Sequence, residues 1–141
     1  MILLDTDHLT VLSYPEGSKS AVLTARMQAA ASETFATTVV SVEEQMRGWL
    51  AEINRWRQLH KQIPAYERFA LLFDFLSNWE IALFDQRAAD ECENLRRQRL
   101  RIGTQDLKIA SIALVENALL LSANLRDFRL VPGLRVENWL E

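Results

Sequence analysis

Short apolar runs alternate along the chain with longer stretches in which apolar residues recur every three or four positions. The runs that we predict to be strands are Ile2–Leu4, Thr34–Val40 and Ala118–Leu121, with Trp79–Phe84 and Leu134–Val136 as weaker candidates. Buried strands that alternate with helices are typical of layered α/β proteins. The pattern therefore predicts an α/β fold with a parallel sheet.

The helices are predicted from their apolar spacing and from capping and turn residues. One follows Asp5 and continues through Leu9 and Leu12, and a second opens at Ser41. Pro64 suits the first turn of a third helix, so we expect a helical hairpin over about residues 41–78. Two more helices are expected over Gln86–Leu100 and Gln105–Val115, the last with Thr104 as its N-cap.

Length and composition narrow the class of protein. The 141 residues fit a single domain, and one cysteine, Cys92, cannot form an intrachain disulfide. The net charge of −3 excludes a protein that holds nucleic acid by bulk positive charge. Asp5 interrupts the first apolar run too early for a signal peptide or membrane span, so we expect a cytoplasmic protein with no membrane partner.

Four acidic residues lie where predicted strands end or helices begin: Asp5, Glu44, Asp106 and Asp127. Each has a structural explanation when it is taken alone. Asp5 or Thr6 can cap the first helix, and Glu44 lies three residues after Ser41, as in a capping box. Asp106 and Asp127 each suit the first turn of a helix, where carboxylates interact favourably with the helix dipole.

Their shared location gives these acids a second interpretation. The corresponding ends of a parallel sheet meet at one edge, which is the ligand-binding edge of open α/β folds. Four carboxylates in one cleft repel one another unless a cation neutralises them, and oxygen ligands suit Mg²⁺ or Mn²⁺. His8 and His60 lack the spacing of a zinc motif, and we interpret them as surface or packing residues. Such acid clusters characteristically activate water for attack on phosphodiesters.

Four stretches resemble the PIN-domain family, in particular the VapC-type ribonuclease toxins of prokaryotic toxin–antitoxin pairs. They are MILLDTDHL, SVEEQMRG, RIGTQDLKIASIAL and LLLSANLRDFRLVPGLRVENW, and their order and spacing match over essentially the whole chain. Asp5, Glu44, Asp106 and Asp127 match the four acids of that family. Thr6, Ser122 and Asn124 match polar positions that line its metal site or hold its acids. Asp7 and Ser122 depart from the asparagine and threonine that are common there, and Asp7 adds a charge that could change metal affinity.

The resemblance implies a three-layer sandwich with a mostly parallel central sheet flanked by helices. It also implies a Mg²⁺- or Mn²⁺-dependent endoribonuclease that is held inactive by a cognate antitoxin and forms a homodimer. The four acids would then be both metal ligands and catalytic residues.

Basic residues and the hairpin each leave two interpretations open. Arg96, Arg97, Arg99 and Arg101 could bring RNA phosphates to the cleft, or they could be a solvated helix end paired with nearby acids. The apolar stripe of the hairpin, which includes Trp49, Ile53 and Phe73, is first explained by core packing and second by an interface.

Two other classes of protein remain possible at this level. A strand followed by Asp5-Thr6-Asp7 also resembles the start of haloacid-dehalogenase-type phosphatases, in which the first aspartate is a nucleophile. Length and the position of Lys108, the only lysine after Lys61, speak against this class. The other possibility is a non-catalytic module of the same fold that binds RNA or protein.

Overall fold

The computed structural model describes all residues 1–141 and has a central sheet of five strands in the order β3-β2-β1-β4-β5. The strands are β1 (Ile2–Leu4), β2 (Phe35–Thr38), β3 (Glu80–Ala82), β4 (Leu119–Leu121) and β5 (Arg135–Glu137). Every neighbouring pair is parallel, which confirms the predicted α/β class. The sheet is wholly parallel where the resemblance implied a mostly parallel one.

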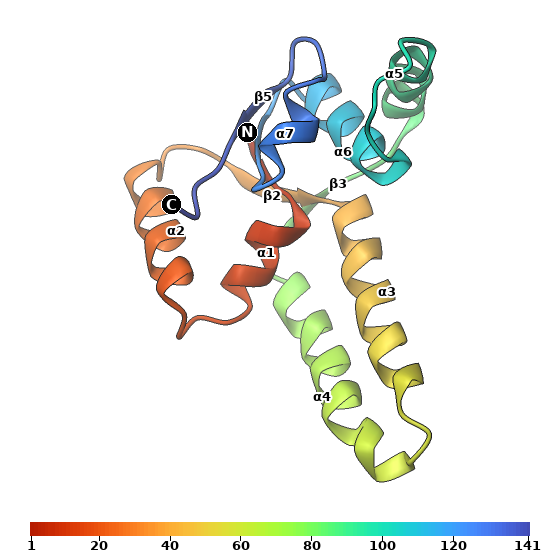
Figure 1. Ribbon diagram of the computed structural model, residues 1–141. Coiled ribbons are helices and arrows are strands. Elements are labelled where there is room, and N and C mark those ends of the chain that lie inside the picture. Colours follow the sequence, from red (N-terminus) through yellow and green to blue (C-terminus); the bar gives the residue numbers. More distant parts are fainter.

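Seven helices connect or follow these strands (Figure 1). They are α1 (Thr6–Leu12), α2 (Ser18–Ala29), α3 (Val39–Arg55), α4 (Leu59–Leu76), α5 (Gln86–Arg97), α6 (Thr104–Val115) and α7 (Leu125–Phe128). We did not predict α2 from its sequence. Only Ser20 and Leu23 of this helix are buried, so its pattern of apolar residues is weak.

Alternate residues of β1 point to opposite faces of the sheet and enter two different cores. Leu3 packs in the larger core with Leu107, Ile109 and Ile112 of α6. Ile2 and Leu4 pack on the other face with Leu23 of α2. Helices α5 and α6 therefore cover one face and α2 the other, as Figure 1 shows, which gives the expected three layers.

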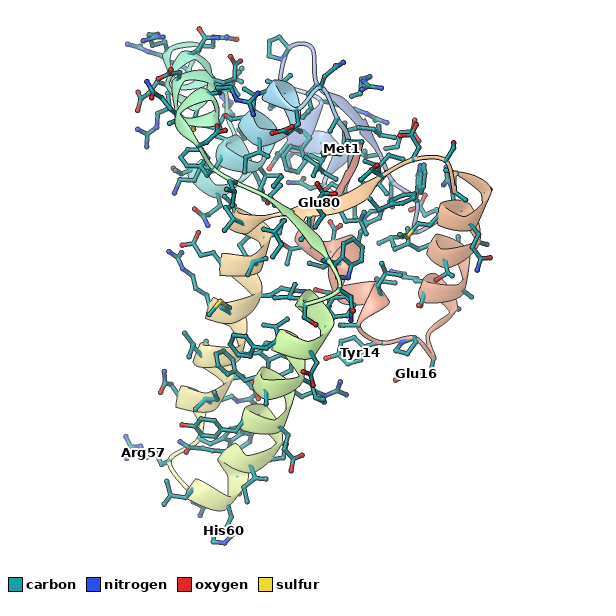
Figure 2. All side chains as sticks on the ribbon, turned by 180° about the vertical axis from the view of Figure 1, so that it is seen from behind. Met1, Tyr14, Glu16, Arg57, His60 and Glu80 are labelled. Carbon is teal, nitrogen blue, oxygen red and sulfur yellow. The ribbon has the colours of Figure 1, made fainter.

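Helices α3 and α4 form the expected hairpin and extend away from the sheet (Figure 1). Arg57 and His60 lie at its far tip (Figure 2), where both are exposed. Near the sheet, Leu72 and Leu76 pack with Leu9 of α1 in a third small core. None of the helices combines the length and the apolar character that a membrane span requires.

Several predicted helix starts are wrong by one to five residues. Helix α3 begins at Val39 rather than Ser41, because the Thr38 side chain accepts a hydrogen bond from the Ser41 N–H and is the N-cap. Thr104 is the first residue of α6, whose N-cap is Gly103. Pro64 lies inside α4, which begins five residues earlier, rather than in its first turn.

Candidate active site

Asp5 is buried at the carboxyl end of β1, where it is also the N-cap of α1. Its Oδ1 accepts a hydrogen bond of 2.8 Å from the Thr6 N–H, and its Oδ2 accepts one of 2.7 Å from the Ser122 hydroxyl. Burial, together with the charge of Asp7, raises the pKa of the Asp5 carboxyl from 3.8 to about 7. Asp5 is thus the N-cap of α1, as one interpretation of the sequence predicted, and this role leaves its carboxyl at the edge of the sheet where the site was expected.

Glu44 lies in α3, and its Oε1 accepts a 3.0 Å hydrogen bond from the hydroxyl of Thr6, the residue after Asp5. The capping box expected with Ser41 is absent, since Thr38 caps the helix and Glu44 lies in its second turn. Burial raises the pKa of Glu44, and the charge of Asp106 adds to this effect. Glu44 thus belongs to the same group of carboxylates as Asp5 and Asp106.

The neighbouring Glu43 lies in a different environment. Its carboxylate accepts hydrogen bonds from Gln105 at 2.9 Å and from Arg47 at 2.6 Å. The bond from Gln105, and then the charge of Arg47, lower the pKa of Glu43 below its ordinary value. Sequence alone separated Glu43 from Glu44 only weakly. The partners distinguish them, because Glu43 forms an ion pair with Arg47 and Glu44 forms none.

Asp106 and Asp127 are joined by the amide of Asn124. The Asn124 Nδ2 donates to Asp106 Oδ2 at 3.1 Å and to Asp127 Oδ2 at 3.2 Å. Asp106 lies in the first turn of α6 and Asp127 in α7. Burial, followed by the charge of Asp127, raises the pKa of Asp106. Asn124 therefore holds together two carboxylates that would otherwise repel each other.

Asp7 lies beside these carboxylates, since its charge raises the pKa of Asp5 and of Asp106, but its own oxygens face other partners. Its Oδ2 accepts a hydrogen bond from the Ala123 N–H at 2.9 Å, and its Oδ1 lies 2.6 Å from Nδ1 of His8. Burial opposes ionisation of Asp7, but the bonds from His8 and Ala123 outweigh it and lower its pKa. We predicted surface or packing roles for the two histidines, and His60 is exposed while His8 is fully buried beside Asp7. The position of His8 next to an acid at a strand end was the signal that could have identified it.

The site carries excess negative charge. No lysine or arginine forms an ion pair with Asp5, Glu44, Asp106 or Asp127. No three His, Cys, Asp or Glu side chains are already arranged as a metal-binding cluster. The donors nevertheless fit a hard divalent cation, since all are oxygen atoms and three of the carboxyls have raised pKa values. A bound cation would favour the ionised forms.

A groove opens beside this site between α1 and the hairpin of α3 and α4. It has a volume of about 830 Å³, and its lining includes Thr6 and Glu44 of the site. The lining also includes Trp49 of α3 and Leu71 and Phe75 of α4. Tyr14, which also lines the groove, faces α4 in Figure 2, with the Arg68 guanidinium 4.7 Å from its ring.

The candidate basic residues lie on the surface. Arg96, Arg97, Arg99 and Arg101 are all exposed, at the end of α5 and in the segment that leads into α6 and Asp106. Arg96 lies 3.4 Å from Glu93, whereas the other three form no ion pair. Pairing with acids thus accounts for only one of these four arginines.

Comparison of the sequence with known proteins finds curated relatives that match about half of the chain. Ribonuclease VapC2 of Rickettsia felis is 41% identical over 69 residues, which is 46% of this chain and 52% of the relative. The tRNA(fMet)-specific endonuclease VapC of Salmonella typhimurium is 30% identical over 83 residues, 56% of this chain and 63% of the relative. The matches thus span between about half and two-thirds of these relatives. No family model matches the chain.

Comparison with solved structures finds matches that extend over essentially the whole chain. The structure of VapBC2 from Rickettsia felis bound to a promoter DNA fragment matches with a TM-score of 0.72 and 26% identity over 99% of both chains. FitAcB from Neisseria gonorrhoeae matches in fold, with a TM-score of 0.72 and 20% identity over 98% of this chain and 97% of that one. The local sequence matches and the likeness in fold together confirm the resemblance of this chain to the VapC-type PIN-domain family.

Proposed function

We propose that this protein is a metal-dependent endoribonuclease, the toxin of a toxin–antitoxin pair. The observation that carries this proposal is the group of carboxylates at the edge of the sheet. Asp5, Glu44 and Asp106 have pKa values raised by burial, and no basic side chain forms an ion pair with them. The relatives that are named ribonuclease or endonuclease support hydrolysis of RNA as the reaction.

The residues that would hold Mg²⁺ or Mn²⁺ are Asp5, Glu44, Asp106 and Asp127. When bound, the cation supplies charge neutralisation and activation of water for attack on a phosphodiester. Ser122 and Thr6 orient Asp5 and Glu44 through the hydroxyl bonds described above. Asn124 holds Asp106 beside Asp127. The protein thus fixes the directions of the carboxylate oxygens before a cation or substrate arrives.

Exposed arginines in the segment that leads into α6 and Asp106 provide a surface for the substrate. Arg97, Arg99 and Arg101 have no acidic partner, so their guanidinium groups are available to phosphates. Arg96 extends this cationic segment, although it pairs with Glu93. Local contacts of this kind are required because the whole chain carries a net charge of −3. We assign RNA binding to this segment.

The groove beside the hairpin is the surface that we assign to the antitoxin. The solved structures of similar fold include toxin–antitoxin complexes. A partner segment that fills the groove would pack against apolar residues such as Trp49 and Phe75 and would end beside Glu44. Such a segment would block the carboxylates without competing for the arginines. A homodimer and a cytoplasmic location complete the proposal, and the buried, unpaired Cys92 is compatible with a reducing compartment.

Two alternative functions have less support. In a phosphatase of the haloacid-dehalogenase type, Asp5 would attack phosphorus, but both of its oxygens accept hydrogen bonds. Lys108 donates to Gln105 rather than to an acid of the site. A non-catalytic module would retain the fold without turnover. It would not require four carboxylates that form no ion pair at the edge of the sheet.

Cleavage of total RNA by the purified protein tests the proposal. We expect discrete fragments with Mg²⁺ or Mn²⁺ and none with EDTA or with the Asp106→Asn variant, read on a sequencing gel. A phosphoryl-enzyme intermediate would support the phosphatase instead. RNA that is bound equally well with and without divalent cations, and never cut, would support the non-catalytic module.

A further inference from the structure

His8 is a fully buried histidine next to the candidate active site, and both of its ring nitrogens have partners. Its Nδ1 lies 2.6 Å from Oδ1 of Asp7. Its Nε2 accepts a 3.0 Å hydrogen bond from the backbone N–H of Trp139, which lies 131 residues later in the chain. The imidazole therefore connects a residue of the site to the C-terminal segment.

The backbone contact determines which nitrogen carries the proton. A peptide N–H can only donate, so Nε2 of His8 must be the acceptor in this pair. The proton of the neutral ring is then on Nδ1, from which it is donated to the Asp7 carboxylate. One hydrogen bond to the C-terminal segment thus prepares His8 to hold Asp7.

Asp7 uses its second oxygen to hold the turn after β4. Its Oδ2 accepts the Ala123 N–H at 2.9 Å, and the Ser122 hydroxyl lies 3.4 Å away. The Ser122 hydroxyl in turn donates to Asp5 at 2.7 Å and accepts the Asn124 N–H at 3.0 Å. Asp7 is therefore linked through one short turn to Asp5 and to Asn124.

The two donors explain why an aspartate suits this position. His8 Nδ1–H and the Ala123 N–H approach different oxygens of the same carboxylate, so both side-chain atoms must be acceptors. An asparagine offers one acceptor and one donor, and its amide nitrogen would face one of these N–H groups. The departure of Asp7 from the common asparagine is thus matched by the presence of His8.

The C-terminal segment is itself fixed to the body of the protein. Trp139 and Leu140 are buried in the core that contains α2. Arg26 of α2 donates to the carbonyls of Asn138 and Glu141, and its guanidinium lies 5.0 Å from the Trp139 ring. The Trp139 N–H that His8 accepts therefore has a fixed position.

We propose that His8 is a positioning residue of the candidate active site, held in its Nδ1–H tautomer by the Trp139 backbone and acting through Asp7. In this arrangement, the C-terminal segment, His8 and Asp7 set the turn at residues 122–124, and that turn sets Asp5 and Asn124. The effect on metal affinity rests on the proposed function, whereas the hydrogen-bond relay does not.

Two variants each remove one half of the relay. His8→Asn keeps an amide donor near the place of Nδ1 but has no group that reaches Trp139. His8→Gln can place an oxygen near the position of Nε2 but has no donor for Asp7. The Leu140→Ala variant is the matched control, because it weakens the packing of the C-terminal segment without removing a hydrogen bond of the relay.

Amide hydrogen exchange of Ala123 and Trp139 reports on the two halves separately. With His8→Gln we expect exchange at Ala123 to become about tenfold faster while Trp139 stays protected. With His8→Asn we expect the reverse. The Mn²⁺ affinity should fall about tenfold in His8→Gln and stay near the wild-type value in His8→Asn and Leu140→Ala.

Equal losses of protection at both amides in both histidine variants would overturn the proposal, because the ring would then only fill space. So would unchanged exchange at Ala123 in His8→Gln. If either variant fails to fold, the nitrogen chemical shifts of His8 in the wild-type protein decide, and the Nε2–H tautomer would overturn the relay. A wild-type protein that binds no Mn²⁺ would contradict the proposed nuclease, while the exchange pattern would still decide on His8.

Discussion

The buried carboxyl of Asp5 makes the free energy of unfolding depend on pH. The pKa of its carboxyl is about 7 in the folded protein, above the ordinary value of 3.8. Between these two values the folded state binds more protons than the unfolded state, so stability must fall as the pH rises. The raised pKa values of Glu44 and Asp106 act with the same sign, whereas the lowered pKa of Asp7 acts with the opposite sign and only below its ordinary value of 3.8.

We therefore expect the metal-free protein to lose stability as the pH rises from about 4 to about 7. The Asp5→Asn variant should show a slope smaller by about one proton over this range. Chemical denaturation at a series of pH values measures both slopes. Identical slopes for the two proteins would contradict the assigned pKa of Asp5.

Glu43 and Glu44 provide a matched test of which carboxylates form the site. Glu44 accepts a hydrogen bond from Thr6, whereas Glu43 is bonded to Arg47 and Gln105. We expect Glu44→Gln to reduce RNA cleavage at least about 100-fold and Glu43→Gln to change it less than about threefold. Initial rates with Mn²⁺ give both numbers. A larger loss in Glu43→Gln than in Glu44→Gln would reverse the assignment.

The cap of α3 is a feature that the sequence located incorrectly. The Thr38 hydroxyl accepts the Ser41 N–H at 3.0 Å in a buried environment. Thr38→Ala should lower the free energy of unfolding by about 1–2 kcal/mol, because that N–H loses its partner. Thr104→Ala is the control, since Thr104 is exposed and makes no capping bond. Thr104→Ala should lower the free energy of unfolding, measured by urea denaturation, by less than about 0.5 kcal/mol. A larger loss than that of Thr38→Ala would favour Thr104 as the N-cap of α6.

The hairpin combines a packed side with an exposed side. Leu72 is 6% exposed and Phe73 is 50% exposed, although they are adjacent in α4. Leu72→Ala should lower the free energy of unfolding by about 2–4 kcal/mol, because it leaves a cavity between α4 and α1. Phe73→Ala should cost about 1 kcal/mol or less, which thermal unfolding would show. Similar costs for both would mean that the hairpin packs differently.

The sequence predicted well those elements that are defined by a run of buried residues. It predicted poorly those helix starts that depend on capping hydrogen bonds. The three residues of β1 are fully determined by an apolar run that Asp5 ends. The start of α4 could not be predicted, because Pro64 is common in the first turn of helices but also fits the inside of this one. The four acids could be chosen from order and spacing. The relay through His8 could not, because Trp139 is distant in sequence and contributes only its backbone.

At the scale of the whole molecule, a net charge of −3 makes binding of RNA depend on where the cations lie. Arg97, Arg99 and Arg101 are exposed, form no ion pair and lie in the segment that leads to Asp106. Arg55, Arg57 and Lys61 carry the same total charge where α3 ends and α4 begins, although Arg55 lies 3.7 Å from Glu52. Figure 2 shows Arg57 at this far tip of the hairpin. The fold thus separates two sets of equal formal charge.

This separation gives a test in which total charge is constant and position differs. Binding of a fluorescent single-stranded RNA is measured between about 50 and about 200 mM salt in the Asp106→Asn background, so that no cleavage occurs. Replacing Arg97, Arg99 and Arg101 by Gln should reduce the slope of log affinity against log salt by about 2, since each lost phosphate contact contributes about 0.7. Replacing Arg55, Arg57 and Lys61 by Gln should leave the slope nearly unchanged. Equal reductions of the slope in both triple variants would mean that total charge, rather than the position of the cations, determines binding. A reduction only in the variant of Arg55, Arg57 and Lys61 would place the RNA on the hairpin.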